Sequence, residues 1–235
     1  MIGIIGAMQV EIDGLKAMLG GAETTTISGI DFVTGKLHGT DVVLAVCGVG
    51  KVFAALCAQT MILRFGVQAI INTGVAGTLC RELGIGDVAI STDVVQHDMD
   101  TSPLGDPVGL LSGINVIHLP ASKILSTLVA DVIGELGLNY RLGTIATGDQ
   151  FLAAQERKDW IHQTFGAIAG EMEGGSIGHV CYVNHVPFVV IRTISDDADG
   201  NAPENFPLFA EATAKSAIRI TAAVLEKVSN GQKLD

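Results

Sequence analysis

The segment Pro187-Phe-Val-Val-Ile-Arg-Thr-Ile-Ser-Asp196 decides the fold class of this chain. Residues 188–191 form a continuous apolar run rich in β-branched side chains, which is typical of a strand covered on both faces of a sheet. Arg192 and Asp196 follow at once, so ionisable groups are expected where this core strand emerges. Ligands bind at the carboxyl ends of strands in open α/β sheets, which makes this strand end a candidate site.

Strands and helices alternate along the rest of the chain. The apolar patterns predict strands at residues 2–5, 31–37, 41–46, 69–71, 87–95, 141–146 and 167–171. Helices are expected between them, at residues 12–19 with a stop at Gly20-Gly21, from Gly50 to Gly66, from Ser122 to Gly137, and at 153–163, 175–183 and 206–228.

Two of these helices carry specific predictions about which face is buried. In the helix after Gly50, we expect Phe53, Leu56, Cys57 and Met61 to share one face. In the C-terminal helix, the side chains expected to point inward are Phe209, Ala214, Ile218, Ala222 and Leu225.

This order predicts an α/β fold in which residues 1–235 form a single domain. We expect a three-layer α/β/α sandwich with a central, twisted, mixed but mostly parallel sheet. The antiparallel part is expected from residues 31–46, where His38-Gly39-Thr40 reads as a hairpin turn.

The composition excludes several classes of function. Apolar residues make up 48% and charged residues 17% of 235 residues, which is the balance of a globular protein. The net charge of −11 would repel nucleic acid. No apolar run is long enough to span a bilayer, and no basic segment precedes the N-terminal apolar residues as in a secretory signal. The four cysteines lack zinc-ligand spacing, so we expect reduced thiols in a cytoplasmic protein.

Polar or glycine-rich groups follow four of the predicted strands, at residues 6–11, 72–77, 171–173 and 192–199. Each has a plain structural interpretation: an acidic cap in solvent, a glutamate favoured at a helix start, or a tight turn. Their convergence at one sheet edge favours function, because a partly buried carboxylate can donate protons and another can grip a vicinal diol. The carboxylates of Glu171 and Glu173 flank Met172 at the end of a strand, and we expect them to point to opposite sides.

Metal and acyl-transfer chemistry are not indicated. His97-Asp-Met-Asp100 has no partner at helical metal spacing and is interpreted as a loop at an edge of the subunit. The sequence contains no GxSxG turn and no complete dinucleotide fingerprint, which disfavours a Rossmann-type oxidoreductase.

Taken together and in order, five motifs resemble the 5′-methylthioadenosine/S-adenosylhomocysteine nucleosidases, within the nucleoside phosphorylase fold. They are Gly6-Ala-Met-Gln-Val-Glu11, Asn72-Thr-Gly-Val-Ala-Gly77, Ala146-Thr-Gly-Asp-Gln-Phe151, Glu171-Met-Glu173 and Arg192-Thr-Ile-Ser-Asp196. The resemblance implies hydrolysis of the N-glycosidic bond of 5′-modified adenosines in methionine salvage and S-adenosylmethionine recycling, by a homodimer that needs no metal or organic cofactor.

The same resemblance implies roles for individual residues. Asp196 would be the general acid at purine N7, and Glu11 would activate water with help from Arg192. Glu173 would bind the ribose hydroxyls. The remaining substrate-binding positions would be Met8, Val49, Val75, Phe151, Leu152, Met172, Ser195 and Phe206. A partner loop around residues 98–104, with Thr101 and Leu104, would close the 5′-substituent pocket.

Two alternatives stay open: a phosphate-dependent nucleoside phosphorylase of the same fold and a non-catalytic nucleoside-binding protein. Glu11 favours hydrolysis, because a carboxylate near the first strand end would repel phosphate. The partner-loop residues Thr101 and Leu104 are smaller or more polar than expected, so the preferred 5′-substituent stays open among methylthioadenosine, S-adenosylhomocysteine, 5′-deoxyadenosine and 6-amino-6-deoxyfutalosine.

Overall fold

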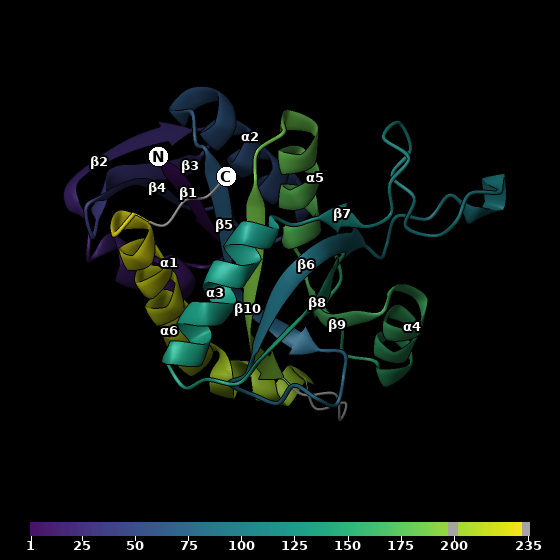
Figure 1. The fold of residues 1–235 in the computed structure, drawn as a ribbon. Coiled ribbons are helices and arrows are strands. Elements are labelled where there is room, and N and C mark those ends of the chain that lie inside the picture. The colour runs from purple at the N-terminus through teal and green to yellow at the C-terminus, as the bar shows by residue number, and fades with distance from the viewer. Residues whose placement is uncertain (197–201, 232–235) are drawn as a thin grey trace.

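The computed structural model describes residues 1–196 and 202–231, with the backbone alone for residues 202–208 (Figure 1). The strands are β1 (Ile2–Gly6), β2 (Gly20–Ile27), β3 (Ile30–Leu37), β4 (Thr40–Val46), β5 (Ala69–Thr78), β6 (Val88–Gln96), β7 (Leu119–Pro120), β8 (Tyr140–Thr147), β9 (Ala167–Glu171) and β10 (Phe188–Asp196). The helices are α1 (Gln9–Lys16), α2 (Lys51–Phe65), α3 (Lys123–Glu135), α4 (Gln155–Phe165), α5 (Gly174–Asn184) and α6 (Ala202–Ser229), with a 3-10 turn, η1 (Ser102–Leu104).

All described strands belong to one mixed sheet, as predicted. Strand β1 pairs in parallel with β4 and β5, and β5 pairs in parallel with β10. Strands β2, β3 and β4 form an antiparallel meander. At the other end, β6, β8 and β9 pair in parallel, whereas β10–β6 and β5–β9 are antiparallel. Because β5, β10, β6, β8 and β9 pair in a circle, this half of the sheet closes on itself, which the sequence pattern did not indicate.

Helices cover both faces of the sheet, which gives the predicted three layers (Figure 1). One core joins the sheet to α1, α3 and α6 through residues such as Ile12, Leu128 and Leu225. The second core lies under α2 and α5 and includes Met61 and Ile177. Helix α4 packs beside the closed half of the sheet, over a separate small hydrophobic cluster that includes Ile161 and Phe165.

Several element boundaries differ from the prediction. Helix α1 ends at Lys16, and Gly20-Gly21 opens strand β2 instead of stopping a helix. Strand β2 was not predicted because it is exposed along almost its whole length and therefore lacks alternating apolar residues. Strand β5 continues through the glycine-rich turn to Thr78, since it gains partners in β9 and β10 there.

The predicted inward faces were partly wrong. Cys57 and Met61 of α2 are fully buried, but Phe53 and Leu56 are 50% and 45% exposed. Helix α2 buries the alanines Ala54 and Ala58 beside Cys57 and Met61, whereas Phe53 and Leu56 face outward. On α6, the four smaller predicted side chains are buried, whereas Phe209 is 37% exposed.

The fold brings the polar strand ends together as predicted. Strands β1, β10 and β9 each pair with β5, so the carboxyl ends of these three strands meet around residues 72–78 of β5. Arg192 lies opposite Gly74 and Asp196 opposite Gly77 in the β10–β5 register. A bulge between Ile194 and Asp196 locally redirects the end of β10.

Candidate active site

A cavity of about 270 Å³ opens at the carboxyl ends of these strands, near the lower limit of the ~300–1,000 Å³ typical of small-molecule sites. It is large enough for one small ligand. The residues that line it are Ala7, Met8, Glu11, Val49, Val75, Ala76, Gly77, Gln150, Phe151, Leu152, Gly170, Glu171, Met172, Glu173, Ser195 and Asp196.

Glu11 is held by backbone donors that follow strand β1 and that lie within strand β5. Its Oε2 accepts hydrogen bonds from the amides of Ala7 (2.7 Å) and Met8 (2.9 Å), and its Oε1 accepts one from Val75 (3.2 Å). Burial raises the pKa of Glu11, whereas the charge of Arg192 and these three amides oppose the rise. The carboxylate therefore combines a fixed orientation with an elevated proton affinity, which suits a general base.

Two glycines of β5 leave room for the carboxylates. A Cβ on Gly74 would lie 2.6 Å from Glu11 Oε1, and a Cβ on Gly77 would lie 2.6 Å from Asp196 Oδ2. Both distances are too short for any side chain. The glycine-rich segment 72–77 therefore acts neither as a phosphate loop nor as a simple turn, but as a flat backbone against which two carboxylates rest.

Three carboxylates, those of Glu171, Glu173 and Glu11, act on the guanidinium of Arg192 behind the cavity lining. Arg192 contacts Glu171 through a short ion pair, lies 3.8 Å from Glu173 Oε2, and donates to Asn72 Oδ1 at 2.6 Å. The pKa of Glu173 is raised to about 7 by burial and by the charge of Glu171, although Arg192 and the Gly50 amide lower it. Carboxylate charge is in excess here, and such a site favours positive charge in a ligand.

The prediction that Glu171 and Glu173 point to opposite sides was wrong, because both reach Arg192. Residues i and i+2 of a strand lie on the same face, so this expectation did not follow from strand alternation. Strand β9 moreover ends at Glu171, and Glu173 stands at the N-cap of α5. Glu171 also accepts from the amides of Glu173 (3.1 Å) and Gly174 (2.7 Å) and from the hydroxyl of Thr147. Glu171 thus fixes the turn that presents Glu173 to the cavity.

Asp196 stands at the end of the cavity near Ser195 and Gly77. The Ser195 hydroxyl donates to its Oδ1 at 3.3 Å, and the ammonium of Lys158 from α4 lies 3.3 Å from its Oδ2. Burial raises the pKa of Asp196, whereas Lys158 and Ser195 lower it. A buried carboxyl group with a raised pKa can carry a proton to a ligand.

An apolar loop at residues 148–152 covers one side of the cavity. Phe151 is 51% exposed beside the half-buried Leu152. The loop is tied to the start of α2, since Asp149 accepts from the Lys51 amide at 2.8 Å and donates its own amide to Asp98 at 2.9 Å. Asp98 completes the contact with a 2.7 Å ion pair to the Lys51 ammonium.

Comparison with known proteins agrees with this geometry. The family model described as the phosphorylase superfamily matches residues 1–226. A 5′-methylthioadenosine/S-adenosylhomocysteine nucleosidase of Oceanobacillus iheyensis is 38% identical over 228 residues, covering 97% of this chain and 99% of the relative. The chain belongs to the 5′-methylthioadenosine/S-adenosylhomocysteine nucleosidase family.

Another relative is named for a different nucleoside substrate. An aminodeoxyfutalosine nucleosidase of Helicobacter pylori is 36% identical, covering 97% of this chain and 98% of the relative. A solved structure of H. pylori 5′-methylthioadenosine/S-adenosylhomocysteine nucleosidase with butyl-thio-DADMe-Immucillin-A superposes with a TM-score of 0.92, at 36% identity and over 96% of this chain and 97% of that one.

Within this nucleosidase fold, most of the predicted site residues meet at the cavity. Arg192 does not line the cavity itself, because it lies behind the lining and contacts it through Glu171 and Glu173. Leu104 is the last residue of η1 and Thr101 directly precedes η1, on the segment between β6 and β7 that projects away from the body (Figure 1). They do not line the cavity of this chain. The side chain of Phe206 lies outside the described residues.

His97 differs from its predicted place at the edge of the subunit, because its side chain is 1% exposed. Its Nδ1 lies 3.3 Å from Arg157 Nη2, and a Cβ on Gly148 would collide with its ring. Among the described residues, no cluster of three or more potential ligand side chains could hold a metal ion. The described helices also include none that is both long and apolar enough to cross a membrane.

Three polar residues of this nucleosidase site were not predicted: Asn72, Thr147 and Lys158. Asn72 and Thr147 sit within quoted motifs, but their contacts depend on strand pairings that a single sequence does not reveal. The sequence could have indicated that Lys158 is buried, because it shares one face of its helix with Ile161 and Phe165, at i, i+3 and i+7. A lysine on such a face predicts a buried partner of opposite charge.

Proposed function

We propose that this protein hydrolyses the N-glycosidic bond of 5′-modified adenosines, releasing adenine. The observation that carries the proposal is the placement of Glu11 and Asp196 in one small cavity, both buried and both with a raised pKa. Names of relatives such as the O. iheyensis nucleosidase support the substrate class.

In the proposed reaction, Asp196 donates its proton to purine N7 as the bond between N9 and C1′ breaks, and the bonding electrons leave with adenine. Glu11 holds a water molecule and accepts its proton as the oxygen attacks C1′. Glu173 accepts hydrogen bonds from the ribose hydroxyls, with Met8 and Met172 against the sugar. Positive charge develops on the ribose, and the carboxylate excess around Arg192 stabilises it.

At the base, Phe151 stacks on adenine, and the backbone at Leu152 reads its hydrogen-bonding edge. Val49, Val75 and Ser195 complete this part of the lining. Stacking fits the apolar, half-exposed position of Phe151, which a bound purine would cover.

Hydrolysis is favoured over phosphorolysis by the surroundings of Glu11. The amides of Ala7, Met8 and Val75, which could otherwise bind an anion, all donate to Glu11. Phosphate would have to displace this carboxylate or lie against its negative charge, whereas a water molecule can accept or donate a hydrogen bond beside it. Methylthioadenosine and S-adenosylhomocysteine are the proposed substrates, with 5′-deoxyadenosine and 6-amino-6-deoxyfutalosine as further candidates supported by the H. pylori relative.

We also propose that the working form is a homodimer. Large apolar side chains are exposed on α2, where Val52, Phe53 and Leu56 are 45–71% exposed, and Leu104 on the projecting segment is 83% exposed. A patch of this kind is typical of a protein interface. The partner's Thr101 and Leu104 would then reach the open side of the cavity, near the half-exposed Val49 and Phe151.

A cytoplasmic location is proposed from the cysteines. All four are buried and unpaired, and reducing compartments keep thiols in this state.

The deciding experiment is incubation of the pure protein with methylthioadenosine in phosphate-free buffer, following free adenine. Adenine release that is unchanged by added phosphate supports the nucleosidase, whereas cleavage that requires phosphate would assign the chain to the phosphorylases. Binding without any cleavage under either condition would support a nucleoside-binding protein. Light scattering of the same sample tests the dimer, which predicts twice the mass of one chain.

A further inference from the structure

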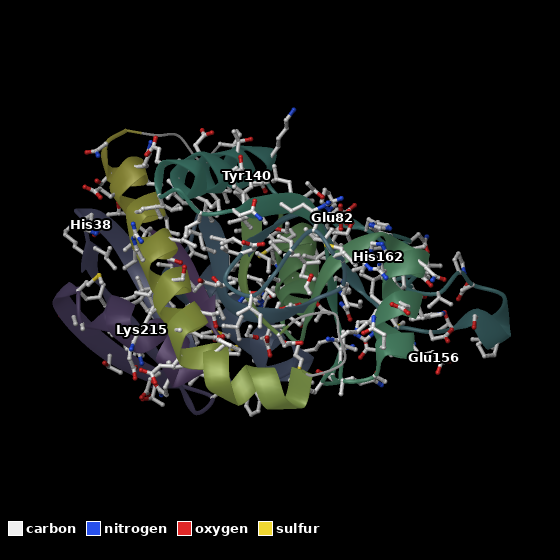
Figure 2. The ribbon with its side chains drawn as sticks, turned by 90° about the horizontal axis from the view of Figure 1, so that it is seen from below. His38, Glu82, Tyr140, Glu156, His162 and Lys215 are labelled. Atoms are coloured by element: carbon white, nitrogen blue, oxygen red, sulfur yellow. The ribbon has the colours of Figure 1, made fainter. Side chains whose placement is uncertain are left out.

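A buried lysine faces the proposed general acid from a helix outside the cavity lining. The Lys158 side chain is 1% exposed, the Asp196 side chain is 5% exposed, and their Nζ and Oδ2 atoms lie 3.3 Å apart. Its neighbours along α4 behave differently: Glu156 and His162 are exposed and visible at one end of the molecule in Figure 2.

This burial is not explained by packing alone. Ile161 and Phe165 fill the rest of the inward stripe of α4, and an apolar residue at position 158 would continue that stripe. A lysine is almost never fully buried unless its charge is paired. Burying a neutral side chain at this position would cost less desolvation free energy than burying the ammonium. The ammonium nevertheless lies directly against a carboxyl group that must change its charge during the proposed reaction.

Helix α4 also connects Asp196 to the loop at residues 148–152, which is proposed to contact adenine. The loop at residues 148–152 leads into α4, which begins at Gln155. Lys158 lies one turn into the helix, so its ion pair fixes the start of α4 against the end of β10. The loop that would stack on adenine and the group that would protonate it are thereby held in register.

We propose that Lys158 is a positioning residue for Asp196, holding the Oδ2 oxygen and stabilising the carboxylate that remains after the proton has moved to N7. This proposal rests on the proposed nucleosidase reaction. The contact of Lys158 with Oδ2 leaves Oδ1 to carry the transferable proton. When the C1′–N9 bond breaks and its electron pair enters the purine, that proton moves from Oδ1 to N7. The resulting carboxylate is then neutralised by the ammonium, which keeps its own protons.

Few other groups act on Asp196 among the described residues. Within the described part of the chain its polar contacts are with Ser195 of β10 and Lys158 of α4. The carboxylates of Glu11, Glu171 and Glu173 are grouped around Arg192, and Asp196 is not among the described carboxylates that act on Arg192. Removing the Lys158 charge should therefore weaken the acid, because the carboxylate product loses its closest counter-charge.

The test is the pH profile of kcat/KM for adenine release from methylthioadenosine, between pH 5 and 10. Wild type is compared with Lys158→Met, which keeps the length and removes the charge, and with Lys158→Arg, which keeps the charge. Lys123→Met, on the exposed start of α3, is the matched control. Activity falls on the alkaline side as Asp196 loses its proton, so the proposal expects this limb to move up by at least one pH unit in Lys158→Met. Lys158→Arg and Lys123→Met should keep the wild-type position.

An alkaline limb in Lys158→Met that coincides with wild type, or moves to lower pH, overturns the proposal. A purely structural role would lower the plateau without moving the limb. If Lys158→Met does not fold, the double variant Lys158→Met/Asp196→Asn, which removes both charges, keeps the test open. The proposal then expects it to fold and to be no slower than Asp196→Asn alone, whereas a further tenfold loss would refute coupling through Asp196. Wild-type protein that releases no adenine would instead defeat the proposed function, independently of Lys158.

Discussion

Glu173→Gln should make the folded protein less sensitive to pH, because Glu173 is buried at a cost. Its carboxylate is 6% exposed, accepts from the Gly50 amide at 2.9 Å, and lies among the charges of Glu171, Arg192 and Glu11. Glutamine has nearly the same shape and keeps an oxygen for the Gly50 amide. The substitution therefore removes the titrating charge with little change in packing.

The sign and size follow from the raised pKa of Glu173. The folded protein holds this proton up to about pH 7, whereas the unfolded chain releases it near the ordinary value of 4.5. Stability from this group is therefore fully present below pH 4.5 and is lost as the pH rises to 7. At about 1.4 kcal/mol for each pKa unit, the loss is about 3 kcal/mol, most of which falls between pH 5 and 8.

Urea unfolding at a fixed protein concentration, repeated from pH 5 to 8, measures this directly. The difference in the free energy of unfolding, variant minus wild type, should increase by roughly 2–3 kcal/mol across the range. Taking the difference cancels every titration that both proteins share. Glu156→Gln, which removes an exposed carboxylate from α4, provides the control for net charge (Figure 2). A difference that stays constant with pH would refute the electrostatic description of the site.

Three substitutions test the proposed chemistry. Asp196→Asn cannot donate a proton as an acid, so kcat for adenine release should fall about 10²–10⁴-fold while calorimetry still detects nucleoside binding; near-normal kcat would remove Asp196 from its role. Glu11→Gln should bind nucleoside but lose turnover to a similar degree, and a parental rate would place the base elsewhere. Gly77→Ala puts a methyl group 2.6 Å from Asp196 Oδ2 and should lower kcat at least ~10-fold, whereas Gly84→Ala, with 3.8 Å of clearance, should not; equal rates for the two would contradict the close fit.

The fold was predictable where buried apolar residues occur in continuous runs or at regular spacing along the chain. Strand β9 and the core of β10 were found from continuous apolar runs, and the start of α3 from its Ser122 cap, whose hydroxyl accepts from the Leu125 amide at 3.3 Å. Strand β2 was missed since it is a solvent-exposed edge strand. The closure of the sheet through β5, β10, β6, β8 and β9 was also missed, because it depends on which strands pair and not on what each strand contains.

The site was predictable to the extent that its residues follow strands. Glu11, Glu173 and Asp196 each stand at or just beyond a strand end, so the shared sheet edge brings them together. The orientation of Glu173 was predicted wrongly, because residues i and i+2 of a strand share a face and because β9 ends at Glu171, before Glu173 caps α5. Lys158 enters the site from the side through α4, whose position beside the closed half of the sheet no local pattern specifies.

The distribution of charge around the cavity fits the proposed departure of adenine and the proposed preference for water over phosphate. Around Arg192, the carboxylates of Glu171, Glu173 and Glu11 share one guanidinium, and burial together with the charge of Glu171 raises the Glu173 pKa to about 7. A ribose that develops positive charge at C1′ relieves the repulsion among these carboxylates only while the bond is breaking, so the stabilisation belongs to the transition state and not to the bound substrate. At the other end, the single ammonium of Lys158 favours a negative Asp196, which is the state of the acid after transfer. The two ends therefore favour opposite charges, and both favour the arrangement in which the glycosidic bond has begun to separate.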